Sequence, residues 1–591
     1  MEYKPPLKDM KFVLDELLDV NEMTSFPGYE EASIDMMEMI LEELGEGAIR
    51  SWLPLNKIGD QEGCKFDNGK VTTPSGFKEV YRQTCESGQA SLSCEIEHGG
   101  QGLPQVLEMA VNEMACSTNL SLAIYFTLAR AAYDTVMSHG SEEMKELYLP
   151  KLASGEWGGT MCLTEPHCGT DLGIIKTRAE PIKDGTYKVT GTKMFISSGE
   201  HDLTDNIIHL VLAKLPGAPK GTRGISMILV PKFIPKEDGT NGERNSLSCG
   251  SIEHKMGVKG SATCVMNYDG ATGWIVGEPN KGLEYMFTMM NRERIAVGLT
   301  GIGLGEISYQ NALLYAKERI QGRDLKGAKN PDEEADPIIV HPDVRRMLMR
   351  MRCLVEGGRA MVLWAAKVHD MSLKHPDAKK RKEAGELLEM LTPIVKAFLT
   401  DAGSEICNIG IHVYGGHGYI QEHGMEQLIR DARIGTIWEG TNGIQAMDLA
   451  GRKMPMHTGR FLRRFFHPIL EFIDENKNDE EMKEFIEPFS KGVKGLQKTT
   501  LYLAQKGLGN PYEIGAGAYD YLQQFGYVTM GYLWAKMAKI ALSKKDEDVF
   551  YRNKIISARF FFERMFSQTI SHAVAIASGS KTTMAIDSED F

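Results

Sequence analysis

The sequence predicts an α+β protein in which helical segments precede and follow one β domain. Apolar residues recur at helical spacing before residue 156 and again after residue 280. Between these limits, short β-branched runs are separated by Gly, Asp and Asn, the pattern of a compact antiparallel sheet. The two patterns occupy separate stretches and do not alternate, so a doubly wound parallel sheet is not expected.

The helical pattern begins after a charged, amphipathic N-terminal extension at residues 1–35. Residues 36–155 are predicted to form an N-terminal helical domain, because runs such as "LPQVLEMAVNEMACSTNLSLAIYFTL" carry apolar stripes. Residues 156–280 are predicted to form the middle β domain, with "TYKVTGTKMFISSG", "NIIHLVLAKL" and "RGISMILVPKF" as strands. The change of pattern near residue 156 therefore marks the boundary between these two domains.

Two more segments complete the chain. Residues 281–455 are predicted to form a C-terminal four-helix-bundle domain, with Pro342 placed to start one helix. Residues 456–591 form a helical C-terminal extension, rich in Phe and Tyr and broken by the acidic run "DENKNDEEMKE". The cluster Met286, Met289 and Met290 could line a flexible pocket, although such stripes are more often plain core.

Length and charge restrict the class of protein. A chain of 591 residues is too long for one core. The formal net charge of -13 argues against a nucleic-acid binder, because no cationic surplus exists to neutralise phosphates. The N-terminus has no signal peptide pattern, and no run of about 18 apolar residues lacks charge. We therefore expect a cytoplasmic protein without a membrane span.

The cysteine pattern argues against metal binding. The ten cysteines contain no C-x-x-C pair, so we expect reduced, mostly buried thiols and no metal site.

Two glycine-rich stretches allow different interpretations. "GLTGIGLGE" lacks the third glycine of a dinucleotide fingerprint, because Glu306 occupies that position, and close helix packing is favoured. In "YGGHGYI", Gly415, Gly416 and Gly418 would let a ligand approach the backbone, or would form a plain interhelical turn.

Three further stretches have a functional and an ordinary interpretation. The loop "MCLTEPHCGTDLG" supplies hydroxyls and free backbone N–H groups for a polar cofactor edge, or is an ordinary turn. In "GTKMFISSG", Phe195 and Ser197 share one strand face, which suits a flat heteroaromatic ring but also occurs in half-buried strands. In "RIGTIWEGTNGIQ", Glu439 lies between an apolar run and a flexible turn, where a buried carboxylate would need a specific reason.

Taken together, these stretches resemble the acyl-CoA dehydrogenase family of flavoproteins. The matching segments, in the family's order over residues 36–455, are "CLTEPHCGTD", "GTKMFISSG", "IEHKMGVKGSATC", "NRERIAVGLTGIGLGEISYQNALLYAKERIQGR", "YGGHGYIQEHGMEQLIRDARI" and "IWEGTNGIQ". The opening and closing extensions are similar to the longer bacterial branch, that of the 3-methylmercaptopropionyl-CoA dehydrogenases. The fold implied is that of an acyl-CoA dehydrogenase with an extra helical extension.

The resemblance implies FAD-dependent α,β-dehydrogenation of an acyl-CoA thioester. Glu439 would abstract the α-proton, a hydride would pass from the β-carbon to flavin N5, and trans-2-enoyl-CoA would result. The backbone N–H of Glu439 would polarise the thioester carbonyl, and such a donor contributes ~3–4 kcal/mol. Burial beside Ile437 and Trp438 would raise the pKa of Glu439, whereas a helix starting near Thr441 would lower it, and the sequence leaves the balance open.

The resemblance also assigns roles to individual residues. The residues implied to bind FAD are Met161, Leu163, Thr164, Thr170, Phe195, Ser197, Arg319, Gln321, Gly415, Gly416 and Thr441. The residues implied to bind substrate are Thr170, Asn291, Arg294 and Gly440. Arg319 would bind the FAD pyrophosphate of a neighbouring subunit, because a guanidinium matches phosphate oxygens.

The chain departs from the family at a few positions. Asn291 stands where relatives often have Asp, and His412 and Gly443 stand where many have Gln. His167 and Cys168 replace small residues, so the CoA entrance would be narrower. Because His412 and Gly443 replace glutamines, the adenine end of FAD would be held differently. None of these departures removes the catalytic apparatus.

Partners and alternative functions follow from the same resemblance. The implied partners are an acyl-CoA, either 3-methylmercaptopropionyl-CoA or a fatty acyl-CoA, and electron-transferring flavoprotein. A homo-oligomer is implied. The extension would either cover the substrate channel or replace a second dimer layer, and a dimer is favoured over a tetramer. The alternatives are an acyl-CoA oxidase that uses O2 and a catalytically silent scaffold.

Overall fold

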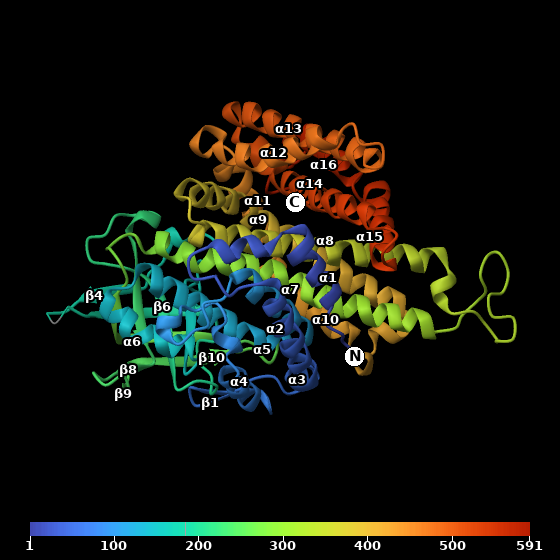
Figure 1. Ribbon diagram of the computed structural model, residues 1–591. Coiled ribbons are helices and arrows are strands. Elements are labelled where there is room, and N and C mark those ends of the chain that lie inside the picture. The colour runs from blue at the N-terminus through green and yellow to red at the C-terminus, as the bar shows by residue number, and fades with distance from the viewer. Residues whose placement is uncertain (184) are drawn as a thin grey trace. The chain divides into compact units, whose positions relative to one another are not determined.

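The computed structural model describes residues 1–183 and 185–591, and the chain divides into two compact units (Figure 1). The first unit comprises residues 1–43, 105–117 and 297–591. The second comprises residues 44–104 and 118–296. Both units are helical in large part, and the second contains the β-sheet. The predicted α+β class, with a β domain between helical segments, is confirmed.

The second unit is built around a seven-stranded sheet. Its strand order is β10-β11-β5-β4-β6-β3, and β7 pairs with β11 and β6. The strands are β3 (Trp157–Cys162), β4 (Arg178–Pro181), β5 (Tyr187–Ser197), β6 (Asn206–Lys214), β7 (Ile225–Pro231), β10 (Leu247–Ile252) and β11 (Thr263–Ile275). Two short hairpins accompany it, β1 (Lys65–Asp67) with β2 (Lys70–Thr72) and β8 (Phe233–Pro235) with β9 (Asn241–Arg244).

Most pairings in this sheet are antiparallel, as predicted, but the sheet is mixed. β3 pairs with β6 in parallel along its whole length, and β4 pairs with the end of β6 in parallel. β6 is buried along eight of its nine positions, which explains its continuous apolar run, because a strand covered on both faces loses the alternation of a half-exposed strand. The parallel pairing is a non-local feature that the local pattern could not reveal.

The helices of the second unit are α3 (Leu53–Glu62), α4 (Phe77–Glu86) and α6 (Glu142–Ala153). Three helices span the division between the units: α2 (Ile34–Gly47), α5 (Gln105–His139) and α7 (Gly282–Glu318). In α5, Asn119 has non-helical dihedral angles, so the helix is kinked next to the division. The residues Met286, Met289 and Met290 of α7 are buried, which supports their interpretation as core.

The first unit is helical. Its helices are α1 (Leu7–Lys11), α8 (Pro342–Lys374), α9 (Ala378–Tyr414), α10 (Met425–Arg433), α11 (Asn442–Met447), α12 (Met456–Asn476), α13 (Lys483–Gly509), α14 (Pro511–Ser543), α15 (Val549–Phe560) and α16 (Gln568–Ala577). Pro342 is the first residue of α8, as predicted. In the extension, α14 packs against α13, α15 and α16 and also touches α8, α9 and α11 (Figure 1). The extension is therefore joined to the bundle mainly through α14.

Small residues let α7 and α9 pack closely. A Cβ on Gly298 would lie 2.7 Å from Val395 O, and one on Gly301 would lie 2.4 Å from Leu399 O. A Cβ on Gly403 would lie 2.4 Å from the Cα of Gly301. These distances confirm that "GLTGIGLGE" is a helix-packing motif.

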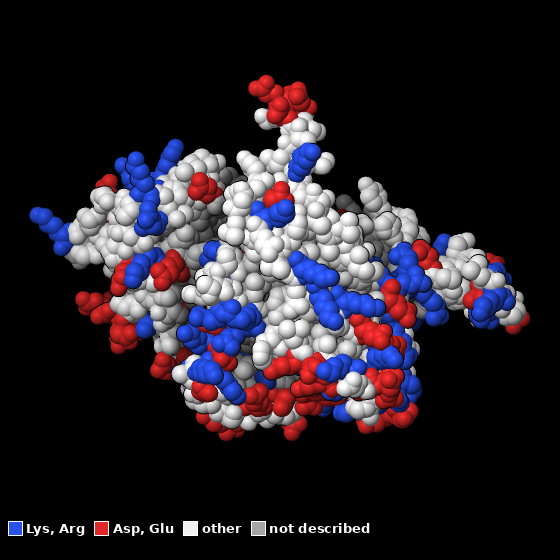
Figure 2. All heavy atoms as spheres, turned by 90° about the horizontal axis from the view of Figure 1, so that it is seen from above, with Lys and Arg blue, Asp and Glu red and all other residues white. Residues whose placement is uncertain are grey.

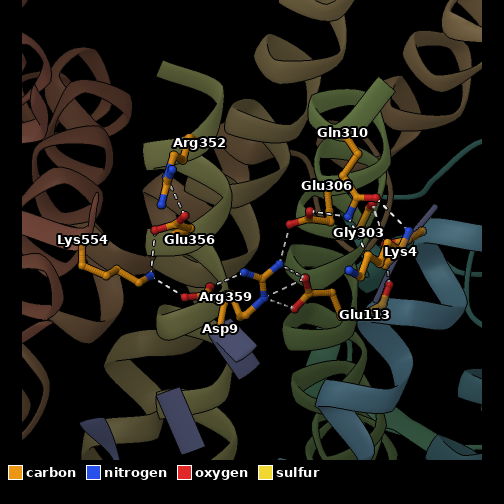
Figure 3. A network of polar contacts seen from close by, with 11 residues as sticks. Lys4, Asp9, Glu113, Gly303, Glu306, Gln310, Arg352, Glu356, Arg359 and Lys554 are labelled. Carbon is orange, nitrogen blue, oxygen red and sulfur yellow. Dashed lines mark hydrogen bonds and ion pairs between the residues drawn. The ribbon is translucent and has the colours of Figure 1, made fainter. Parts of the chain in front are cut away.

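A buried ion network connects both ends of the chain to the bundle (Figure 3). Arg359 of α8 contacts Glu113 of α5, Glu306 of α7 and Asp9 of α1. Lys554 of α15 pairs with the same Asp9, so the N-terminal segment and the C-terminal extension meet at one carboxylate. Removing one partner of such a buried pair is costly, because a charge is left uncompensated.

Other sequence expectations concern charge, cysteines and membranes. On the face seen in Figure 2, acidic and basic side chains both gather mainly toward the edges of a broad area of other residues. All ten cysteines are free and eight are buried, as predicted. Among the described residues, no helix is both long enough and apolar enough to cross a membrane.

One cluster of metal-ligating side chains occurs within the described residues. The ligand atoms of Glu165, His167 and Cys168 lie within 4.8 Å of one another. Glu165 is paired with Lys193, and His167 Nε2 lies 2.9 Å from Ile174 O. Because the Glu165 carboxylate and His167 Nε2 already have protein partners, the cluster gives no case for a metal ion.

Candidate active site

The loop after β3 is fixed by a buried ion pair. The ammonium of Lys193, on β5, lies 2.9 Å from Glu165 Oε1 and donates to Leu163 O at 2.9 Å. Glu165 also accepts from two backbone N–H groups of the loop that follows. Burial lowers the pKa of Lys193, and the contact with Glu165 opposes this shift. The pair holds Leu163 and Thr164 against β5.

The end of β5 presents an aromatic ring and a hydroxyl. The register of β5 against β11 shifts between Cys264 and Met266, so the strand bulges there. Phe195 has a φ of 57° and is 57% exposed. Ser197 is half-buried, and buried Ile196 lies between the two. This arrangement agrees with the predicted common face for Phe195 and Ser197.

Side-chain and backbone bonds join β3 and its loop to β5. Thr160 Oγ1 donates to Ser197 O at 2.7 Å, and the Met194 N–H donates to Thr164 O at 2.9 Å. Met161, the next residue of β3, is half-buried, whereas Thr170 is exposed on the loop that follows. The structure thus brings together Met161, Leu163, Thr164, Phe195 and Ser197 from two separate sequence motifs.

Two predicted substrate-binding residues lie in the first turns of α7. Arg294 Nη1 donates to Asn291 Oδ1 at 3.4 Å, and the Arg294 guanidinium lies 5.8 Å from the Phe287 ring centroid. Arg294 is 6% exposed, and Asn291 is half-buried. Asn291 therefore places an amide oxygen next to the buried Arg294 guanidinium.

Glu439 lies in the short loop between α10 and α11. It has a φ of 56°, and Gly440 has a φ of 82°. A non-glycine residue in the left-handed region costs roughly 1–3 kcal/mol and persists only where its surroundings impose it. Thr441 caps α11, and its hydroxyl accepts from the Ile444 N–H at 3.3 Å, which confirms the predicted helix start.

The apolar neighbours enclose this loop less than the sequence suggested. Ile437 is 49% exposed, and Trp438 and Glu439 are half-buried. The expected burial of Glu439 beside Ile437 is therefore wrong, because Ile437 is about half exposed and Glu439 itself is only half-buried. Trp438 Nε1 is buried and has no hydrogen-bond partner among the described residues.

Two buried side chains hold the carbonyls of the loop. Lys396 of α9 is fully buried, and its ammonium donates to Gly440 O and to Asn442 Oδ1, each at 2.8 Å. Gln445 Nε2 donates to Glu439 O at 3.1 Å. Neither side chain was identified from the sequence. The only local signal for Lys396 was a lysine in an otherwise apolar helical stretch, "PIVKAFL".

The other predicted cofactor residues of the first unit lie at exposed turns. Arg319 Nη2 donates to Gln321 Oε1 at 3.2 Å, and an antiparallel bridge between Ile320 and Pro337 closes the loop that carries them. Gly415 has a φ of 60°, and a Cβ added to Gly415 or Gly416 would meet no atom within 4 Å. The backbone of this turn is therefore open to a large ligand.

Profiles of the acyl-CoA dehydrogenase family match four consecutive stretches of the chain. The N-terminal domain profile matches residues 66–156, the middle domain 160–271 and the C-terminal domain 280–454. A fourth profile, described as acetyl-CoA dehydrogenase C-terminal like, matches residues 465–587. The matches cover both the segments that carry the motifs and the C-terminal extension.

Individual relatives are similar over nearly the whole chain. The chain is 41% identical to 3-methylmercaptopropionyl-CoA dehydrogenase of Ruegeria pomeroyi, covering 96% of each protein. It is 35% identical to a butyryl-CoA dehydrogenase of Syntrophomonas wolfei, covering 95% of this chain and 94% of that one. The fold is similar to that of Bacillus anthracis acyl-CoA dehydrogenase complexed with FAD, with a TM-score of 0.75, 21% identity, and 92% and 88% of the two chains covered.

Proposed function

The chain belongs to the acyl-CoA dehydrogenase family, and from that membership we propose that it removes the α- and β-hydrogens of an acyl-CoA thioester with Glu439 as the base. It is an oxidoreductase that acts on acyl-CoA, and its cofactor is FAD. The observation that carries the proposal is the strained Glu439 loop, whose two carbonyls are held by buried donors.

Taken separately, each of the two units offers groups that suit a part of FAD. Exposed Phe195 and the Ser197 hydroxyl offer a ring surface and a hydrogen-bonding group to the flavin. The open Gly415–Gly416 turn leaves room for the adenine end, and the exposed guanidinium of Arg319 suits a pyrophosphate. When bound, FAD supplies the acceptor for the hydride that leaves the β-carbon.

The chain's own residues supply proton transfer and charge stabilisation. The carboxylate of Glu439 takes the α-proton of the thioester. The backbone N–H of Glu439 donates to the thioester oxygen as negative charge develops there, and a preorganised donor of this kind contributes ~3–4 kcal/mol. Gly440 adds no side chain next to the base, so the thioester can approach it.

The proposed substrate is 3-methylmercaptopropionyl-CoA. The relative named for that substrate is 41% identical across 96% of the chain, more than the 35% of the relative named for butyryl-CoA. A short fatty acyl-CoA is the alternative substrate. We propose that the electrons pass to electron-transferring flavoprotein, and that Arg319 reaches the FAD of a second copy in a homodimer.

Substitution of Glu439 by Gln tests the proposed base. The variant should retain FAD and bind the thioester, yet reduce the flavin more slowly by several orders of magnitude, because the amide cannot accept the proton. Stopped-flow bleaching of the flavin under anaerobic conditions measures this rate. A variant that reduces FAD as fast as the native enzyme would remove Glu439 from the role.

The same assay decides the substrate and the acceptor. The bleaching rate is measured with acyl-CoAs of increasing chain length and with 3-methylmercaptopropionyl-CoA, whose acyl chain contains a thioether. The thioether substrate should give the highest rate. Rapid aerobic reoxidation with release of peroxide would indicate an oxidase instead. Colourless protein that FAD cannot reconstitute would indicate a silent scaffold.

A further inference from the structure

A chain of hydrogen bonds leads from the C-terminal extension, where Tyr519 is 45% exposed, through half-buried Asp401 to buried Asn442 and the loop that carries Glu439. Asp401 of α9 lies at its centre. Asp401 Oδ2 accepts from Tyr519 OH at 2.6 Å and from Gln523 Nε2 at 2.7 Å, and both donors lie on α14. Asp401 Oδ1 accepts from Asn442 Nδ2 at 2.8 Å. One carboxylate therefore joins α14 to the residue three positions after Glu439.

Asn442 passes the constraint to the loop. Its Nδ2 also donates to Ala397 O at 3.1 Å, so the amide is fixed in one orientation. Its Oδ1 then faces the Lys396 ammonium at 2.8 Å, and the same ammonium donates to Gly440 O. The Asn442 side chain is 5% exposed. Water cannot readily replace these bonds, so the position of Lys396 depends on that of Asn442.

The loop needs such support because its backbone is strained. Glu439 has a φ of 56°, which a non-glycine residue adopts at a cost. Lys396 holds the carbonyl of Gly440 and Gln445 holds that of Glu439. Small displacements of a catalytic group lower the rate more than they lower binding, because the reacting atoms must be aligned.

We propose that Asp401, Tyr519 and Gln523 are positioning residues that couple α14 of the C-terminal extension to the Glu439 loop. The inference rests on the proposed role of Glu439 as the base. The extension would then be required for the rate of proton abstraction and would not be a mere covering of the bundle. Tyr519 and Gln523 would act only through Asp401, without touching substrate.

The test removes both donors of α14 and leaves the loop intact. Tyr519→Phe keeps the ring and Gln523→Met keeps the side-chain volume, so the packing of α14 changes little. The double variant should reduce its flavin about tenfold more slowly. A hydrogen bond to a carboxylate changes an equilibrium by roughly 10- to 100-fold, and we expect the lower part of that range to appear in the rate. The acyl-CoA concentration that half-saturates the rate should change less than about twofold, because substrate binding does not depend on alignment of the base.

Backbone exchange gives a readout that does not depend on turnover. Hydrogen–deuterium exchange of the peptide covering residues 437–447 should increase in the double variant, because the loop opens more often. Tyr512→Phe is the matched control. Tyr512 lies in the same helix, is 62% exposed, and its hydroxyl has no hydrogen bond within the described residues. The control should leave both rate and exchange unchanged.

The outcomes separate this inference from the proposed function. If Glu439→Gln abolishes reduction but the double variant keeps the native rate and native exchange, the coupling through Asp401 is refuted alone. If Glu439→Gln reduces FAD normally, the proposed base is refuted and the coupling has nothing to position. Should the double variant fail to fold, Tyr519→Phe alone should show the same changes to a smaller extent, and native behaviour there would refute the coupling.

Discussion

Replacing Glu113 by Gln should remove a pH dependence of stability that the buried ion network creates. The connected network contains the cations Arg352, Arg359 and Lys554 and the carboxyl groups of Asp9, Glu113, Glu306 and Glu356 (Figure 3). Three cations face four carboxyl groups, so one bound proton makes the network neutral. Glu113 is fully buried, and burial raises its pKa from 4.5 to about 7 against the opposing effect of Arg359.

The sign and size of the effect follow from this pKa. Because the folded-state pKa is higher than the unfolded one, the folded chain holds a proton that the unfolded chain releases. The stabilisation is complete below the ordinary pKa of 4.5 and is lost as the pH rises through about 7. Between pH ~6 and pH ~8 the free energy of unfolding should therefore fall by ~1.4 kcal/mol through Glu113 alone.

Urea titrations at these two pH values, followed by circular dichroism, measure the effect. Glu113→Gln should be less stable than the native chain at the lower pH, because its NH2 group replaces Oε2 and cannot accept the bond that Arg359 Nε donates there. Its stability should nevertheless change ~1.4 kcal/mol less between the two pH values. Glu487→Gln, an exposed position on α13, should keep the native pH dependence. An unchanged pH dependence in Glu113→Gln would refute the assignment of the proton to Glu113.

Two further predictions concern the cofactor and the helix packing. Arg319→Ala should lower the FAD content after gel filtration, because a cation for the pyrophosphate is lost. Arg323→Ala is the control in the same loop; its guanidinium donates to Asn330 O, and the variant should retain FAD. Equal FAD content in the two variants would contradict the role of Arg319. Gly301→Ala should lower the midpoint of thermal unfolding, because the added Cβ would lie 2.4 Å from Leu399 O. Gly515→Ala in α14 should not lower it, because a Cβ there meets no atom within 4 Å. A native midpoint in Gly301→Ala would show that α7 and α9 can separate without cost.

Local features of the structure could be predicted from the sequence. The helix start at Pro342, the cap at Thr441 and the packing glycines of α7 depend on residue types at short spacing, and each is as predicted. The order of the motifs identified the family and, with it, the candidate roles of Glu439, Phe195 and Arg319. Those roles remain proposals.

The environment of Glu439 depends on contacts that leave no local pattern. The parallel pairing of β3 with β6 and the exposure of Ile437 also depend on non-local contacts, and the sequence analysis predicted neither of them. Lys396 and Asn442 are 46 residues apart, and Asp401 and Tyr519 are 118 residues apart. A lysine or an aspartate in a helix looks like a surface charge until tertiary packing excludes water from it. The sequence by itself therefore determined which elements form and which family they belong to, whereas only the tertiary structure decided which buried polar groups hold the strained loop, because desolvation and non-local hydrogen bonds arise only when distant segments meet.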